Sequence, residues 1–175
     1  TKLQTTFGVN ALAIVKGRPQ VLPLKELLRH FVDFRREVIV RRTQFDLRKA
    51  EERAHILEGL KKAIDHLDEV ISLIRASKTP PEAKEVLMSR FEFSDMQAQA
   101  ILDMRLQRLT GLERQKIVDE YEEVLKLIER LKQILASEAL QLRIVVSELE
   151  ALPQQFGDAR RTEIVAQADE ISLED

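Results

Sequence analysis

The side chains that could make or break bonds are few and far apart in this sequence. It contains no Cys and one Tyr, and its three histidines (His30, His55 and His66) lack the i, i+4 spacing that places two metal ligands on one helical face. Tyr121 is flanked by glutamates, whose negative charge disfavours a phenolate nucleophile and repels phosphate. We therefore interpret Tyr121 as a packing residue and the histidines as solvated helix residues. No catalytic residue, metal site or cofactor site is expected within this chain.

Positive charge gathers in one segment, although the formal net charge of the chain is −2. Between Arg35 and Lys49 there are six basic residues and two acidic ones. The pairs Arg35-Arg36 and Arg41-Arg42 are six residues apart, so they overlap on one side of a helix. Two interpretations stay open. These arginines form an ordinary solvated face, or they contact nucleic-acid phosphates, which requires clustered positive charge without base readout.

Long helices must position these residues. No Gly or Pro lies between Leu24 and Gly59, and the helical pattern continues to about Ser77. Apolar residues at 56, 60, 63, 67, 70 and 74 follow alternating steps of four and three, which is a heptad seam. A second seam at 117, 121, 124, 128, 131 and 135 slips in phase near Ser137, where we expect a break before a helix to about Leu152. The two seams predict an antiparallel intramolecular coiled coil.

A small helical lobe is predicted between the two arms. Helix-capping patterns begin at Thr79, Ser94 and Thr110, so we expect helices at roughly 80–90 and 95–108, and then the returning arm. The second helix carries two apolar faces, more than one small core needs, and an exposed apolar face usually marks an interface. We predict that the lobe pairs with a second copy of itself. The candidate interface residues are Met96, Gln97, Ala100 and Met104.

The expected fold class is therefore mainly α: a long antiparallel intramolecular coiled coil with a small helical lobe at its tip and a short N-terminal β-hairpin. The expected units are a hairpin remnant of a preceding domain (1–23), an outgoing arm (24–78), the lobe (79–111), a returning arm (112–152) and an acidic linker towards a further domain (153–175). An isolated hairpin is marginal in water, and the chain begins without Met. We therefore expect a piece of a longer, cytoplasmic protein. No membrane partner is expected, since no apolar run approaches about 18 residues.

Several long blocks of this sequence match a known family. The run from Gln97 to Glu113, QAQAILDMRLQRLTGLE, resembles the dimer-gate motif of the bacterial type IIA DNA topoisomerases. Further similar blocks lie at 5–10 (TTFGVN), 35–43, 53–58 (RAHILE) and 156–164 (FGDARRTEI). The block at 5–10 favours the branch of the DNA gyrase A subunit over that of ParC, its counterpart in topoisomerase IV. A generic coiled-coil interaction module without a DNA role is the remaining alternative.

The resemblance implies a role and a set of partners. It implies that this chain is the non-catalytic exit gate (C-gate) through which two copies of the protein pair. The parent enzyme would be an ATP-dependent topoisomerase that passes one DNA duplex through a transient double-strand break to supercoil DNA. ATP and Mg²⁺ would be handled by the partner, the gyrase B subunit, in an A2B2 complex, and the catalytic tyrosine would lie upstream. Arg35, Arg36, Arg41 and Arg42 would contact DNA phosphates near the base of the arm. Arg105 would contact a gyrase-poisoning plasmid toxin.

Overall fold

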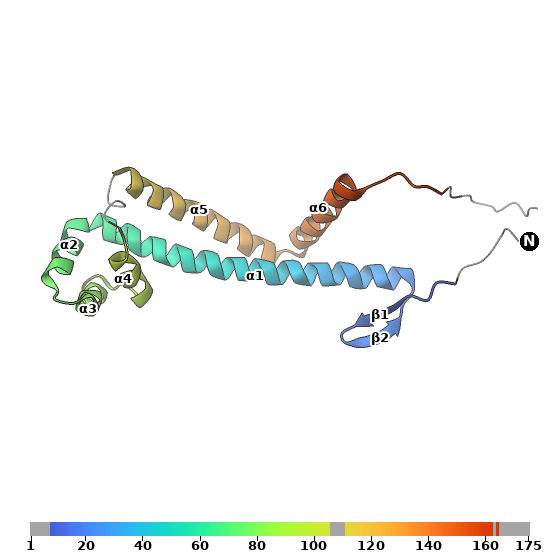
Figure 1. Cartoon of the computed structure of the whole chain (residues 1–175), viewed down its shortest axis with the longest axis horizontal. Coiled ribbons are helices and arrows are strands. Elements are labelled where there is room, and N and C mark those ends of the chain that lie inside the picture. Colours follow the sequence, from blue (N-terminus) through green and yellow to red (C-terminus); the bar gives the residue numbers. More distant parts are fainter. Residues whose placement is uncertain (1–7, 106–110, 163, 165–175) are drawn as a thin grey trace, which may run out of the picture.

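The molecule is elongated, and one long helix spans most of its length (Figure 1). The computed structural model describes residues 8–105, 111–162 and 164. Its elements in chain order are β1 (Leu12–Val15), β2 (Arg18–Val21), α1 (Leu24–Asp65), α2 (Leu67–Ala76), α3 (Pro80–Phe91), α4 (Asp95–Leu102), α5 (Gly111–Ala136) and α6 (Glu138–Phe156). The strands β1 and β2 form an antiparallel hairpin beside the start of α1, and α2–α4 form a lobe at its other end. The predicted mainly α fold with an N-terminal hairpin is confirmed.

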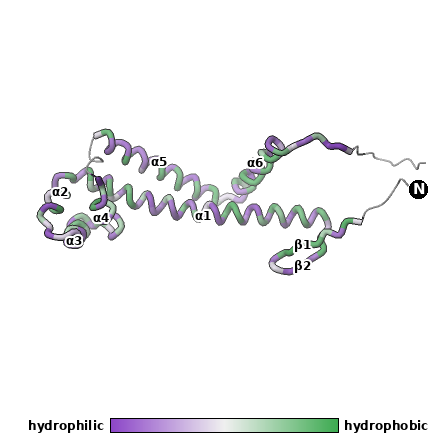
Figure 2. The backbone as a smooth tube through the Cα atoms, viewed as in Figure 1, coloured by the Kyte–Doolittle hydropathy of each residue, from purple (hydrophilic) through white to green (hydrophobic). Residues whose placement is uncertain are grey.

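Helices α1 and α5 pack antiparallel along an apolar seam. Near the middle of α1, Ala50 and Ala54 cluster with Ile128 and Leu131 of α5. Nearer the lobe, the fully buried Leu57 lies in a cluster with Ile117. Residue numbers thus rise along α1 as they fall along α5, which confirms the predicted antiparallel coiled coil. Figure 2 shows the pattern behind it, because hydrophobic residues recur at intervals along both helices between hydrophilic ones.

Ion pairs flank this seam on its solvent-exposed edges. The Arg53 guanidinium lies 2.5 Å from the Glu120 carboxylate, and Lys132 lies 3.3 Å from Glu51. All four side chains are at least 40% exposed, so each pair contributes about 1 kcal/mol or less. Burial of one Leu or Ile side chain contributes roughly 1.5–3 kcal/mol. The apolar seam, and not its charged edges, therefore holds the arm together.

The outgoing helix is shorter than predicted. α1 ends at Asp65, His66 leaves helical geometry (φ −116°, ψ 34°), and α2 turns away to pack against α3 (Figure 1). Val70 and Ile74, whose spacing predicted a seam continuing to about Ser77, instead pack in the cluster that contains Leu87 of α3. Heptad spacing requires only that one face of a helix is buried. It does not say which neighbour buries that face.

The lobe begins with two capped helices, as predicted. The Thr79 hydroxyl accepts a hydrogen bond from the backbone of Glu82, and Ser94 forms a capping box with Gln97. α3 ends at Phe91, but α4 ends at Leu102, six residues before the predicted boundary of 108. The predicted third cap at Thr110 lies outside the described residues, as does the predicted continuation of the second helix over residues 106–108.

The break predicted near Ser137 is confirmed. α5 ends at Ala136, and the Ser137 hydroxyl caps α6 by accepting a hydrogen bond from the backbone of Leu140. The buried amide of Gln141 donates to the backbone oxygens of Ile134 (3.0 Å) and Leu135 (3.3 Å), and so satisfies carbonyls at the end of α5.

The second helix of the returning arm is longer than predicted. α6 continues to Phe156, four residues beyond the predicted end at Leu152, with Pro153 inside it. Proline removes one helical hydrogen bond there. The chain still closes the last turn, because the backbone N–H of Gly157 donates to the Pro153 oxygen.

The lobe is held against α1 by a close approach at Gly59. The Gln97 amide donates to the backbone oxygen of His55 (2.8 Å), and its carbonyl accepts from the backbone of Ser94 (3.0 Å). A His55 ring nitrogen lies 2.6 Å from the Ser94 hydroxyl. The expectation of solvated histidines is therefore wrong for His55, which is half-buried between α1 and α4. A Cβ added at Gly59 would lie 2.6–2.9 Å from Gln97 side-chain carbons.

Replacing this glycine tests the close approach. Alanine in a helix interior is favoured over glycine by about 1 kcal/mol, but at position 59 it must displace Gln97 and break buried hydrogen bonds worth about 1–3 kcal/mol. We expect Gly59→Ala to lower the free energy of unfolding, measured by urea denaturation. The matched control is Gly111→Ala, where nothing lies within 4 Å of the added Cβ. Equal or greater stability of Gly59→Ala would contradict the close approach.

Candidate functional site

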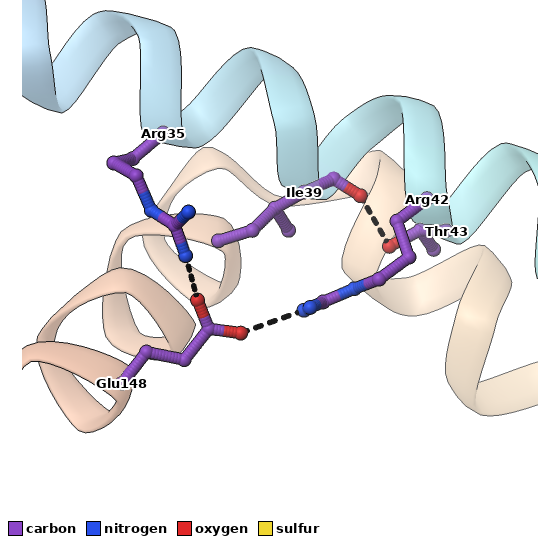
Figure 3. A network of polar contacts seen from close by, with 5 residues as sticks. All are labelled: Arg35, Ile39, Arg42, Thr43 and Glu148. Atoms are coloured by element: carbon purple, nitrogen blue, oxygen red, sulfur yellow. Dashed lines mark hydrogen bonds and ion pairs between the residues drawn. The ribbon is translucent and has the colours of Figure 1, made fainter. Parts of the chain in front are cut away.

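The predicted basic face lies on the half of α1 that packs against α6. The Arg35 guanidinium donates to one oxygen of the Glu148 carboxylate (2.5 Å), and that of Arg42 donates to the other (2.8 Å) (Figure 3). Between the two arginines Ile39 is fully buried, and Thr43 donates to its backbone oxygen (2.8 Å). One glutamate of α6 thus bridges two arginines that are two helical turns apart on α1.

The other two predicted arginines are also paired within the chain. Arg36 forms an ion pair with Glu138 at the start of α6, and Arg41 pairs with Glu37 one turn earlier on α1. Three of the four arginines predicted to contact phosphate therefore bind α6 carboxylates. The sequence placed these arginines on one side of a helix, but their partners on α6 lie about 100 residues away and could not be read from spacing.

The charge of Glu148 is stabilised by this arrangement. The hydrogen bond from Arg42 is the largest influence and lowers the pKa of the Glu148 carboxyl, partial burial opposes it, and Arg35 lowers the pKa further. The side chains of the three residues remain between about a third and a half exposed. Partly exposed pairs of this kind contribute modestly, about 1 kcal/mol or less each. The network fixes where α6 lies more than it stabilises the whole chain.

The predicted interface residues of the lobe have unequal access to solvent. Met96 is 52% exposed, Ala100 and Met104 are half-buried, and Gln97 is 7% exposed with its amide bonded inside the chain. Gln97 thus supports the position of α4, and Met96 is available to a partner. Pairing of lobes stays a prediction for all four residues.

Arg105, the predicted toxin contact, is exposed at the rim of a cleft between the lobe and the arm. The cleft has a volume of about 710 Å³. Ala100 and Met104 line it from the lobe, and Ile56 and Leu60 line it from α1. The structure therefore gathers three of the predicted lobe residues around one hollow.

Most of the exposed apolar surface lies away from the lobe. Within residues 79–105, Met96 is the single large apolar side chain with high exposure. At the opposite end, large apolar side chains are exposed on α1, on α6 and on the hairpin: Leu24, Leu28, Phe31, Phe34, Leu152, Phe156, Leu12, Ile14 and Val21. A concentration of exposed large apolar side chains at one end of a molecule is typical of a contact with other protein. The sequence pattern did not predict this surface.

The described part of the chain offers neither a metal site nor a membrane span. In residues 8–105, 111–162 and 164 no three His, Asp or Glu side chains come together as metal ligands. None of the helices in these ranges combines the length and the hydropathy of a membrane-spanning segment.

Comparison with known proteins decides the family. The family model described as the A subunit of DNA gyrase/topoisomerase IV matches residues 1–150. The chain belongs to the DNA gyrase/topoisomerase IV A-subunit family. This match confirms the resemblance drawn from the sequence blocks.

Individual relatives in this family are DNA gyrase A subunits. The chain is 58% identical over 175 residues to the DNA gyrase A subunit of Clostridium acetobutylicum, covering all of this chain and 21% of the relative. It is 54% identical over 175 residues to that of Deinococcus deserti (all of this chain, 22% of the relative). It is 57% identical over 164 residues to that of Staphylococcus aureus (94% of this chain, 18% of the relative). The chain thus spans about a fifth of the length of these curated relatives, and the ParC alternative is not favoured.

The Glu148 network predicts a pH dependence. Because the folded-state pKa of Glu148 is lowered, its contribution to stability is present above the ordinary value of 4.5 and is lost as pH falls through the lowered pKa. We expect Glu148→Gln to lower the free energy of unfolding at pH 7 by about 1 kcal/mol or less. This deficit should begin to shrink as pH falls below 4.5 and should be lost once pH lies below the lowered pKa, where the wild-type carboxyl is protonated. Urea denaturation across this pH range measures it.

The matched control is Glu150→Gln, which removes the same charge from α6 where the described residues show no ion pair. This variant should differ little from the wild type at any pH. A deficit of Glu148→Gln that persists unchanged at low pH would contradict the ionised network.

Proposed function

We propose that this chain is the exit-gate arm of a gyrase-type A subunit. The observation that carries the proposal is the placement of the lobe: it lies at the far end of the α1–α5 arm from both the hairpin and the end of α6 (Figure 1). The 42 residues of α1 correspond to about 63 Å at 1.5 Å per residue. A contact made by the lobe is thus separated from the body at the base by a stiff spacer, and a small flexing at the base becomes a large displacement at the tip.

The lobe would meet the lobe of a second copy of the chain and close the exit from a cavity. Such a contact must hold while a double-strand break is open and must separate when the transported duplex leaves, so an interface of intermediate size suits it. The lobe's modest exposed apolar surface, which includes Met96, supports this proposal. Arg105, exposed beside the same cleft, is the proposed contact for a toxin that acts on the gate.

The base of the arm would join the rest of the protein. The apolar side chains exposed on the hairpin, on the start of α1 and on the end of α6 support this proposal. Residues 1–23 would then belong to a preceding domain, 24–78 and 112–152 to the two arms, 79–111 to the exit gate, and 153–175 to a linker. In the described structure α2 packs with the lobe, so the functional lobe would include residues 67–76.

The parent enzyme would supply the chemistry. The full-length protein would act on DNA in a cytoplasmic A2B2 complex with the gyrase B subunit. The whole enzyme would pass one duplex through a transient break in another, with ATP and Mg²⁺ handled by its partner. This chain would contribute the gate and a basic face near DNA, through Arg35, Arg36, Arg41 and Arg42.

A second candidate is a coiled-coil interaction module without a DNA role. The specific observation in its favour is that all four arginines already have carboxylate partners within the chain. In this candidate the basic face serves only to fasten α6. Both candidates include pairing of the lobes, so DNA binding separates them.

Pairing of the lobes can be tested by sedimentation. We expect the wild-type chain to sediment as a dimer, and Met96→Asp or Met104→Asp to shift it towards monomer, because a buried unpaired charge at an interface costs several kcal/mol. The matched control is Leu125→Asp, which places the same charge at an exposed apolar position on α5. A dimer that is unchanged by both lobe substitutions would refute the proposed gate surface.

The phosphate contact predicts a salt dependence. Removal of one phosphate contact reduces the slope of log affinity against log salt by about 0.9 for duplex DNA. We expect replacement of Arg35, Arg36, Arg41 and Arg42 by Gln to weaken duplex binding and to reduce this slope, as measured by fluorescence anisotropy. A control with four exposed cations replaced elsewhere (Arg75, Lys78, Lys126 and Arg130) should change the slope less. Equal slopes for the two variants would favour the module without a DNA role.

A further inference from the structure

We infer that α6 and a phosphate backbone compete for the same arginines of α1, so that binding of duplex DNA releases α6 from the arm. This inference rests on the proposed phosphate contact of the basic face. It goes beyond that contact by assigning the α6 glutamates as internal competitors of DNA and α6 as a movable segment.

The geometry at Glu148 is that of a phosphate-binding pair of arginines occupied by a carboxylate. The two carboxylate oxygens each accept from a different guanidinium, Arg35 at 2.5 Å and Arg42 at 2.8 Å (Figure 3). A phosphodiester also presents two anionic oxygens, and guanidinium groups bind carboxylate and phosphate with the same donors. Arg36 is held in the same way by Glu138. A phosphate that binds these same N–H groups must therefore displace the α6 carboxylates.

The attachment of α6 to α1 is slight enough to be exchanged. Within α6 only Gln141 and Val145 are buried, and the amide of Gln141 is bonded to the end of α5 instead of α1. The carboxylates of Glu138 and Glu148 are open to solvent, with side-chain exposures of 67% and 32%. Beyond this contact α6 diverges from α1 (Figure 1). The ion pairs and an apolar contact that includes Val145 of α6 and the fully buried Ile39 of α1 attach the helix, over a smaller area than the α1–α5 seam.

The junction between α5 and α6 provides a pivot. Ser137 is the only residue between the two helices, in extended geometry (φ −125°, ψ 109°). Its hydroxyl caps α6, and Gln141 caps α5, and neither of these hydrogen bonds involves α1. α6 can therefore change its angle at Ser137 while its own cap is kept, and the Gln141 bonds to the end of α5 limit the size of that change. The seam of α1 and α5 does not have to open.

Competition for shared donors is reciprocal. If phosphate displaces Glu148, then removing the Glu148 charge must strengthen phosphate binding by the same coupling. Release of α6 would also redirect whatever follows Phe156, so that DNA held at the base of the arm would set the direction of the following segment. The coupling is predicted to weaken at high salt, which screens both kinds of contact.

Matched charge variants test the competition. Duplex affinity of the whole chain would be measured by fluorescence anisotropy with a probe of about 25 base pairs for Glu148→Gln and for the control Glu150→Gln. Both remove one negative charge from α6, but only the first frees Arg35 and Arg42. We expect Glu148→Gln to bind about three- to tenfold more tightly than wild type, and Glu150→Gln to stay within about twofold. Glu138→Gln, which frees Arg36, is a second variant and should show a smaller gain.

Release of α6 can be measured directly as a distance, because the chain has no Cys. Spin labels on Gln44→Cys in α1 and Val146→Cys in α6 report the α1–α6 separation, and a pair at Glu58→Cys and Glu123→Cys reports the α1–α5 seam. We expect the first distance to lengthen at saturating duplex and the second to stay constant. Glu148→Gln should lengthen the first distance without DNA.

The outcomes separate the inference from the function on which it rests. Equal affinities of Glu148→Gln and Glu150→Gln, or an α1–α6 distance unchanged by duplex, would overturn the competition even if the chain binds DNA. Unchanged DNA affinity after replacement of the four arginines would refute the phosphate contact, and the competition with it. Circular dichroism of each variant confirms that the helices are intact, so that loss of fold is not mistaken for release of α6.

Discussion

The apolar seam between α1 and α5 is the interaction on which the rest of the structure depends. A helix as long as α1 gains most of its stability from packing of one face, since propensity alone does not hold so long a helix in water. Ala50, Leu57 and Ile117 supply that packing, with the small residue allowing close approach of the two helices. The direction of the arm then fixes where the lobe lies. A lobe at its tip and a body at its base can act at a distance only if this seam is rigid.

The paired helices α1 and α5 end at the two ends of the seam, and polar side chains form the hydrogen bonds that join the next helices there. At the lobe end α1 stops at His66, and the Gln97 amide ties α4 back to α1 where Gly59 leaves room. At the base end α5 stops at Ala136, and Gln141 bonds its last carbonyls. A glutamine thus crosses each junction, and at the base two glutamates hold α6 on α1. The middle of the molecule is apolar and fixed, and its two junctions depend on directional bonds that can be broken one at a time.

The sequence predicted the features that depend on residue spacing and on local hydrogen bonding. It did not predict which distant segment each helix or side chain contacts. The seam residues Ile128 and Leu131 followed from their heptad spacing, and the caps at Thr79 and Ser94 followed from local hydrogen-bonding chemistry. The break at His66 did not follow, because Val70 continues the same spacing in a different core. Nor could the sequence pair Arg35 with Glu148. A guanidinium donates to a carboxylate or to a phosphate with the same N–H groups, and only the fold brings a carboxylate within hydrogen-bond distance.

The distribution of apolar surface matches two contacts with opposite requirements. An association that must open in every cycle cannot bury as much apolar area as a permanent one, because the free energy gained on closing has to be overcome on opening. Met96 is the one large apolar side chain with high exposure within residues 79–105, whereas the base exposes a broad set that includes Phe31 and Phe156. In the proposed arrangement the tip is therefore the separable contact and the base the lasting one. The α6 glutamates lie beside that base, where a change in DNA contact would alter the position of α6 relative to both the body and the arm.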